Sequence, residues 1–185
     1  ALGRAEADAL LAATTAAAGR RMEEMLAGIR AYQAHSFVRD LPPPAELWHE
    51  GTTRLLDYGG DGPAVLFVPS LINRYYVLDL TSERSLVRWL AGHGVRPLVV
   101  DWGAPGEVER DFDLDDYIAG RLGRLLDEVL ATLPGPPVLV GYCLGGNLAL
   151  GLAALRQRDL AGLALLATPW DFHAGHGAQA QLLGM

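Results

Sequence analysis

One short run of the sequence holds the residue types that nucleophilic catalysis needs. Cys143, the only cysteine, lies in Gly141-Tyr142-Cys143-Leu144-Gly145, with a glycine two positions before it and two positions after it. A strand that turns directly into a helix requires small residues at both positions. The turn would put the sulfur at a helix N-terminus, where backbone dipoles favour a thiolate. The pattern predicts a nucleophile, and a buried structural cysteine is the alternative.

A thiolate that attacks an acyl carbon also needs amide donors for the oxyanion that develops. The Leu144 amide directly follows the nucleophile and is the first predicted donor. The second is expected from the loop after the apolar run that ends at Val68, where Leu71 or Ile72 would supply it. The alternative is an ordinary strand-to-helix connection.

Alternating strands and helices must position this turn. After a short strand within 50–58, apolar runs of strand length alternate with helical patterns, with strands at 64–68, 97–102, 136–141 and 160–167 and helices at 82–92, 114–133 and 144–155. Ser82 is the predicted N-cap of the first helix. Because the strands are apolar on both faces, the pattern predicts an α/β fold with a mostly parallel sheet covered by helices.

The N-terminal region has a different pattern. Residues 5–34 are rich in alanine and lack proline, and their apolar residues recur at three- and four-residue steps. This predicts one long helix, or two that break near Gly19. The prolines at 42–44 end it and form a linker. We expect a helical arm at 1–45 and a core at 46–185, with the helix buried against the core or a twin subunit, which makes a homodimer one option.

The composition restricts the class of protein. The 185 residues are half hydrophobic and carry a net charge of −7 without a basic block, which argues against nucleic acid as a partner. A single cysteine cannot form an internal disulfide and fits a reducing compartment. No apolar run reaches the roughly 18 residues of a transmembrane helix, and the polar start is unlike a signal peptide. We therefore expect a cytoplasmic protein.

Several segments resemble motifs of the polyhydroxyalkanoate synthases, in the same order and spacing. They are VPSLINRYYVLDL at 68–80, SLVRWL at 85–90, VDWGAP at 100–105, LDDY at 114–117, GYCLGG at 141–146 and ATPWDF at 167–172. The resemblance implies the α/β-hydrolase fold and an acyltransferase that moves 3-hydroxyacyl groups from CoA thioesters through a Cys143 acyl-enzyme. It implies no metal and no bound cofactor.

Three positions depart from these motifs. Ser70 stands where the synthase segment has its second proline, Arg74 replaces a lysine, and Asn147 replaces a usual threonine. The departures keep open an esterase, thioesterase or polyester depolymerase that uses the same cysteine with water as acceptor. The fold alone does not fix the substrate.

The residues that would activate Cys143 are not evident. A cysteine nucleophile needs a histidine base and an acid that orients it, and the similar synthases carry both far downstream. Only 42 residues follow Cys143. We therefore expect the N-terminal part of a longer protein, with an incomplete hydrolase core, and a catalytically incomplete fragment is the third functional alternative. Asp171 and His173 are the local alternative for the acid and base.

The remaining polar groups have simpler interpretations. His173 and His176 have a metal-like spacing, but no third ligand is evident. Three other histidines are expected at the surface, namely His35, His49 and His93. An acidic cluster precedes the helix at 114–133 and is interpreted as helix capping in preference to a metal site. It consists of Asp111, Asp113, Asp115 and Asp116.

Overall fold

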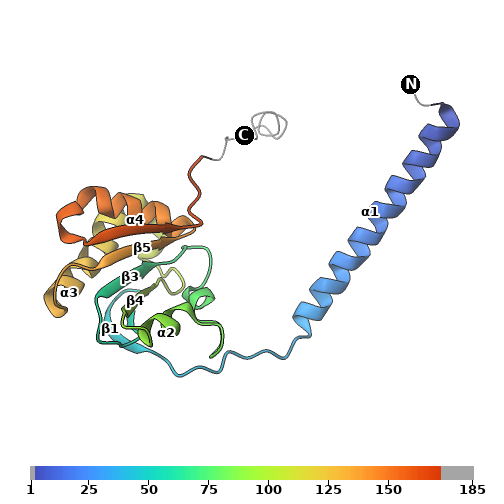
Figure 1. The fold of residues 1–185 in the computed structure, drawn as a ribbon. Helices are drawn as coiled ribbons and strands as arrows, with labels where there is room; N and C mark the ends of the chain where they lie inside the picture. The colour runs from blue at the N-terminus through green and yellow to red at the C-terminus, as the bar shows by residue number, and fades with distance from the viewer. Residues whose placement is uncertain (1–2, 172–185) are drawn as a thin grey trace. The chain divides into compact units, whose positions relative to one another are not determined.

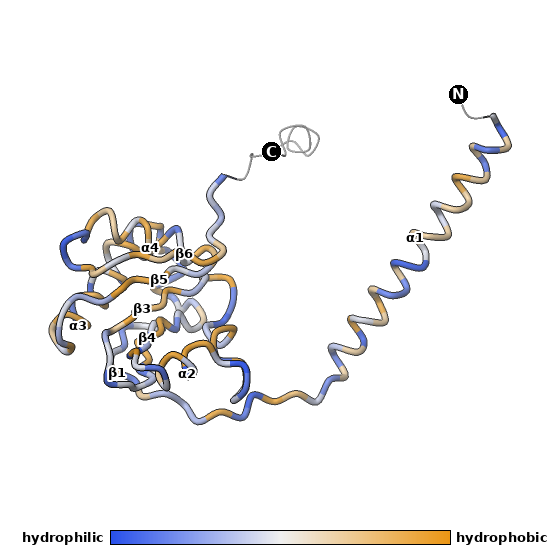
Figure 2. The backbone as a smooth tube through the Cα atoms, viewed as in Figure 1, coloured by the Kyte–Doolittle hydropathy of each residue, from blue (hydrophilic) through white to orange (hydrophobic). Residues whose placement is uncertain are grey.

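The computed structural model describes residues 3–171 and divides the chain into two compact units, Ala1–Arg39 and Asp40–Met185. We call them the N-terminal unit and the core unit. The N-terminal unit contains one unbroken helix, α1 (Arg4–Gln33), so the predicted alternative of a break at Gly19 is wrong. Apolar and polar residues alternate along α1 (Figure 2), and none of its residues is buried.

The core unit is built on a six-stranded sheet in the order β1-β2-β4-β3-β5-β6 (Figure 1). The strands are β1 (Ala45–Glu50), β2 (Thr53–Asp57), β3 (Ala64–Val68), β4 (Arg96–Asp101), β5 (Val138–Tyr142) and β6 (Gly162–Leu166). β1 and β2 form an antiparallel hairpin, and β2 pairs antiparallel with β4. The other four strands are parallel, so their carboxyl ends meet at one edge, as the α/β pattern predicts.

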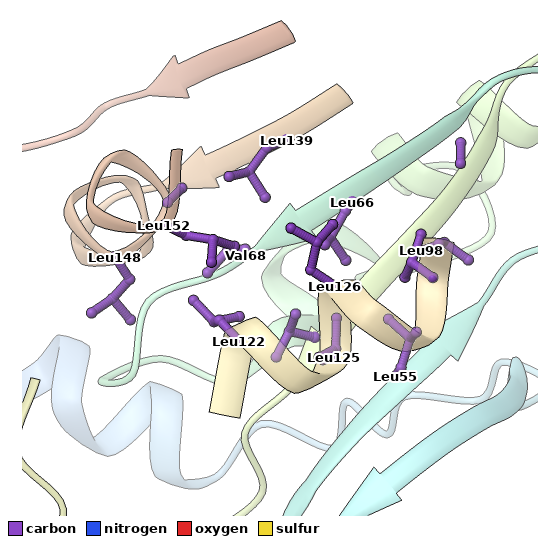
Figure 3. Packing of buried hydrophobic residues seen from close by; sticks show 14 of the residues in the cluster. Leu55, Leu66, Val68, Leu98, Leu122, Leu125, Leu126, Leu139, Leu148 and Leu152 are labelled. Atoms are coloured by element: carbon purple, nitrogen blue, oxygen red, sulfur yellow. The ribbon is translucent and has the colours of Figure 1, made fainter. Parts of the chain in front are cut away.

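Helices cover both faces of this sheet. The helices are α2 (Leu86–Ala91), α3 (Gly123–Thr132), which a π-helix at Asp116–Leu122 precedes, and α4 (Leu144–Leu155), and short 3-10 helices lie at Tyr75–Leu78, Glu109–Asp111 and Gln157–Asp159. Leucines of α3 and α4 pack with strand residues such as Leu66, Leu98 and Leu139 (Figure 3). The alternate strand residues, such as Phe67 and Val99, pack with Val87 of α2 on the opposite face. This alternation explains why the central strands are apolar throughout.

Two sequence predictions need correction, and a third is confirmed with one added feature. The helix predicted at 82–92 begins at Leu86, because Ser85 and not Ser82 accepts the Arg88 amide as N-cap, at 3.1 Å. The helix predicted at 114–133 is confirmed, and it contains a π-helix at Asp116–Leu122, in a stretch where Gly120 weakens the α-helical preference. The last strand is only partly covered, and three of its leucines are exposed at 38–42%: Leu163, Leu165 and Leu166.

A buried ion pair ties the β1–β2 turn to the segment after β4. Arg121, 2% exposed, contacts Glu109, 3% exposed, at 3.1 Å. Arg121 also donates to the Thr53 hydroxyl at 2.7 Å and to the Glu50 carbonyl. Glu109 accepts from the Thr52 amide at 3.0 Å and from the Gly106 amide at 3.1 Å. The loop after β4 is thereby fixed from within the core unit.

Within residues 3–171, no helix combines the length and the apolar character that crossing a membrane requires.

Candidate active site

Cys143 lies at the junction of β5 and α4, as the sequence predicts. Its backbone has φ 53° and ψ −130°, a conformation that residues other than glycine rarely adopt. The side chain is partly exposed. The Cys143 amide donates to the Leu166 carbonyl at 2.9 Å, so the turn is held from the neighbouring strand β6. A strained and partly exposed cysteine at a strand-to-helix turn matches the geometry of a nucleophile elbow.

The glycines around Cys143 have no space for a side chain. A Cβ on Gly141 would lie 2.4 Å from the Gly146 Cα, and one on Gly145 would lie 2.1 Å from the Val68 carbonyl oxygen. A Cβ on Gly146 would lie 1.8 Å from the Thr168 hydroxyl. The predicted role of Gly141 and Gly145 therefore has a physical basis: α4 begins in direct contact with its own strand and with the end of β3.

The two segments predicted to supply oxyanion donors differ in whether their amides already have a hydrogen-bond acceptor. Leu144 is the first residue of α4, and the first amides of a helix have no acceptor within it. In the loop after β3, the Ile72 amide donates to the Ser70 hydroxyl at 3.1 Å. Ser70 is 1% exposed. The Ile72 amide is thus already engaged, a detail that the sequence motif does not reveal.

The same loop is anchored from β4. The indole nitrogen of Trp102 donates to the Pro69 carbonyl at 3.0 Å, and Trp102 is 8% exposed. A cavity of about 190 Å³ lies between the loops after β3 and β4, with Leu71, Arg74 and Asp101 in its wall. The Asp101 carboxylate forms an ion pair with Arg54 of β2 at 2.5 Å. A ligand in this cavity would contact the loop that carries Leu71.

A third loop reaches α4 from the end of β6. The side-chain amide of Asn147 donates to the Pro169 carbonyl at 3.0 Å. Ala167 has φ 49°, so this loop also begins in a strained conformation. Thr168 packs directly on Gly146. These contacts were not predicted from the sequence, although the glycine that directly follows Gly145 is consistent with a close neighbour of the helix at that point.

Within residues 3–171, no histidine side chain is hydrogen-bonded to Cys143. His35, His49 and His93 each bond to an atom within four positions along the chain. Asp171 follows β6 and is exposed. His173 and His176 lie outside the described residues, so the local acid–base alternative stays a prediction.

Two members of the acidic cluster, Asp113 and Asp116, cap the helix that follows them, as predicted. The Asp116 amide donates to the Asp113 carboxylate at 3.0 Å, and the Asp113 amide donates to the Asp116 carboxylate at 3.0 Å. In the described part of the chain, no three histidine, cysteine or acidic side chains are grouped to hold a metal ion.

Comparison with known proteins identifies the family. Residues 63–185 match the family described as alpha/beta hydrolase fold. Among solved structures, the thioesterase domain from the curacin biosynthetic pathway superposes with a TM-score of 0.55 at 20% identity, over 76% of this chain and 50% of that one. An alpha/beta superfamily hydrolase from Oenococcus oeni gives a TM-score of 0.52 at 16% identity, over 67% of this chain and 44% of that one. These likenesses concern the fold.

The sequence relatives are more specific. The chain is 34% identical to the poly(3-hydroxyalkanoate) polymerase subunit PhaC of Haloferax mediterranei over 68% of this chain and 27% of that protein. It is 35% identical to the subunit of Allochromatium vinosum over 58% of this chain and 31% of that protein. It is 29% identical to the subunit of Thiocystis violacea over 85% of this chain and 45% of that protein. The aligned regions thus span less than half the length of each relative.

Together, the elbow at Cys143, the sheet order and these matches show that the chain belongs to the alpha/beta hydrolase fold family and is similar, within it, to the poly(3-hydroxyalkanoate) polymerases.

Proposed function

We propose that this chain carries the nucleophile and the oxyanion hole of an acyltransferase of the polyhydroxyalkanoate synthase type. The observation that carries the proposal is Cys143 in a positive-φ turn between β5 and α4, in a chain whose sequence relatives are named polymerases. A thiol nucleophile suits a CoA thioester, because exchange between two thioesters is nearly isoenergetic. The substrate is therefore a 3-hydroxyacyl-CoA.

In the first half-reaction, the Cys143 sulfur attacks the thioester carbonyl carbon and forms a new carbon–sulfur bond. The carbonyl oxygen becomes an oxyanion, which the Leu144 amide stabilises as the first donor. Leu71 is proposed as the second donor, because the Ile72 amide already bonds to Ser70. The tetrahedral intermediate then breaks its bond to the CoA sulfur, and CoA leaves as the thiolate or, with one proton, the thiol.

In the second half-reaction, the terminal hydroxyl of a growing chain attacks the acyl-Cys143 thioester. An ester bond forms, the bond to Cys143 breaks, and the hydroxyl proton passes to a base. Residues 3–171 contain no histidine bonded to Cys143, so the proposal assigns no base among them. The same donors serve both steps, because both pass through a tetrahedral oxyanion.

The test uses the full-length gene product with 3-hydroxybutyryl-CoA. We expect CoA release, a mass increase on Cys143 that corresponds to one acyl group, and insoluble polyester. Cys143→Ala should abolish all three. Cys143→Ser is the matched control that keeps a hydroxyl nucleophile in the same turn, and it should be much slower, because a hydroxyl needs a base more than a thiol does.

Three results would contradict the proposal in different ways. CoA release with only free 3-hydroxybutyrate as product would assign a thioesterase, with water as the acceptor. Full activity in Cys143→Ala would exclude Cys143 as the nucleophile and would remove both alternatives. No CoA release from the wild-type protein would favour a catalytically inactive member of the family.

The proposed substrate also gives the expected compartment. Acyl-CoA thioesters and a functional free thiol both fit a reducing environment, so we propose the cytoplasm. Fractionation of cells that express a tagged full-length protein tests this, and recovery from the secreted fraction would contradict it.

A further inference from the structure

We infer that Ser70 is a positioning residue for the acyl transfer proposed above: its buried hydroxyl fixes the loop after β3 so that the Leu71 amide faces the oxyanion. The inference rests on the proposed function. It goes further in assigning a role to a residue that departs from the polyhydroxyalkanoate synthase motif, in which a proline occupies this position.

Ser70 is buried and bonded to the backbone of its own loop. Its side chain is 1% exposed and accepts the Ile72 amide at 3.1 Å. A hydroxyl that bonds the backbone two residues further on closes a turn around the residue between them. That residue is Leu71. The bond therefore fixes the peptide that has to present an amide to the substrate.

Few other contacts restrain this part of the loop. Ile72 is 79% exposed, and Asn73 and Arg74 are exposed as well. Side chains that face solvent provide few packing contacts to define a backbone conformation. Leu71 packs partly against the core, but one partly buried side chain does not orient its own amide. The Ser70 bond supplies that restraint.

The start of the loop is fixed by two contacts. The Trp102 indole holds the Pro69 carbonyl at 3.0 Å. A Cβ on Gly145 would lie 2.1 Å from the Val68 oxygen and 2.4 Å from the Pro69 oxygen, so the loop starts in contact with the first turn of α4. Ser70 is the next residue after this anchored pair. Its hydrogen bond to Ile72 extends this restraint to the Leu71 peptide, on the side of the sheet edge where α4 begins at Cys143.

The experiment compares two reactions of the same sulfur in the full-length protein. Acylation by 3-hydroxybutyryl-CoA forms an oxyanion, whereas alkylation by iodoacetamide is a direct displacement that forms none. We expect Ser70→Ala to slow the first-turnover release of CoA by about 10- to 100-fold, as for a misplaced oxyanion donor. The rate of alkylation should stay unchanged. A residue that only supports folding would not separate these two rates.

Two variants serve as controls. Ser70→Thr keeps the hydroxyl and should restore most of the acylation rate. Val87→Ala removes buried side-chain volume on the opposite face of the sheet, where Val87 is 0% exposed. It should lower stability without changing the acylation rate of the folded protein, and so it separates lost stability from a misplaced donor.

The outcomes distinguish this inference from the proposed function. Wild-type acylation in Ser70→Ala, or an equal loss of acylation and alkylation, would overturn the role of Ser70 and leave the function of Cys143 intact. A wild-type protein that releases no CoA, or releases it without acylation of Cys143, would overturn the proposed function and the role of Ser70 with it.

Discussion

Cys143 adopts a backbone conformation that its own side chain disfavours. A non-glycine residue at φ 53° and ψ −130° is held there only because the surrounding contacts require it. Those contacts are the bond from the Cys143 amide to the Leu166 carbonyl and the close approach of Gly145 to the end of β3. Contacts with two neighbouring strands, β6 and β3, therefore hold Cys143 in this strained conformation. A chain that needed only a small apolar residue here would gain stability from glycine.

This gives a prediction about stability at Cys143. Replacing alanine by glycine usually costs about 0.5–1 kcal/mol, because glycine loses more conformational freedom on folding. At a positive φ the sign should reverse, so we expect Cys143→Gly to be at least as stable as Cys143→Ala. Urea unfolding of the two variants measures the difference.

The matched control for this comparison is Ala154, an exposed residue within α4. Ala154→Gly should show the usual loss of about 0.5–1 kcal/mol relative to the wild type. If Cys143→Gly were also less stable than Cys143→Ala by that amount, the turn would not store strain at this residue.

The active-site turn could be predicted from the sequence because its requirements are local. Gly141 and Gly145 are two positions from Cys143, and a side chain on either would clash with neighbouring backbone, at the Gly146 Cα for Gly141 and at the Val68 carbonyl for Gly145. The hydrogen bond from the Ile72 amide to the Ser70 hydroxyl could not be predicted. The sequence motif allows either Leu71 or Ile72 as the oxyanion donor, and only this bond to a buried hydroxyl distinguishes the two amides. The bond from Asn147 to Pro169 joins residues 22 positions apart and leaves no local pattern.

At the scale of the elements, the central strands and α4 were predictable, whereas β1 and the start of α2 were not. The central strands are continuous apolar runs, so β3 lies where the composition places it, at Ala64–Val68. The start of α2 depends on which of two serines, Ser82 or Ser85, forms the N-cap hydrogen bond. Ser85 accepts the Arg88 amide and donates to the buried carboxylate of Asp79 at 2.6 Å, whereas Ser82 is exposed. A tertiary contact therefore selects the cap between two serines that the sequence does not distinguish.

These two serines make a direct test. Ser85→Ala removes the cap of α2 and one hydrogen bond to Asp79, and we expect it to lower the free energy of unfolding by about 1–3 kcal/mol. Ser82→Ala should change it by less than about 0.5 kcal/mol, as at an ordinary surface position. Chemical denaturation of both variants provides the measurement. Equal losses would show that α2 starts where the sequence predicts.

The buried pair of Glu109 and Arg121 makes stability depend on pH. The hydrogen bond from the Thr52 amide, with those from Gly106 and Arg121, lowers the pKa of the Glu109 carboxyl from 4.5 to about 2. Because the folded pKa is the lower one, the unfolded chain binds this proton more readily. The stabilisation is complete above about pH 4.5 and is lost as the pH falls towards 2.

Glu109→Gln should therefore have two effects. At neutral pH it leaves the buried Arg121 with only the Glu50 carboxylate, at 3.3 Å, and should destabilise the core unit by about 3 kcal/mol. Between pH 4.5 and 2 its stability should fall less steeply than that of the wild type. Glu83→Gln, at an exposed position, is the control and should keep the wild-type slope. Parallel wild-type and Glu109→Gln profiles, measured by urea unfolding at each pH, would contradict this account.

At the scale of the whole molecule, the chain forms two units with their own internal contacts, and the boundary lies between Arg39 and Asp40. The helix α1 contains no buried residue, although the sequence predicts that its apolar face is covered. Apolar residues at three- and four-residue steps indicate a helix, but they do not specify the surface against which that helix packs.

The first residues of the core unit are anchored to α2. The Arg88 guanidinium donates to the Pro42 carbonyl at 2.6 Å and to the Asp79 carboxylate at 2.7 Å. A chain that begins at Asp40 keeps this anchor, and we expect it to unfold at the same temperature as residues 1–185. A chain that begins at Ala45 keeps every strand but loses the Pro42 carbonyl. It should lose about 1 kcal/mol, the contribution of a typical hydrogen bond.

Thermal unfolding of the three chains, followed by tryptophan fluorescence, separates the contributions. All four tryptophans of the chain lie in the core unit, so the signal reports the unfolding of that unit alone: Trp48, Trp89, Trp102 and Trp170. If removal of residues 1–39 lowered the transition temperature, α1 would be a stabilising part of the core in solution. If only the longer truncation lowered it, the stabilising contact would be the one between Arg88 and Pro42, and α1 would remain available for another partner.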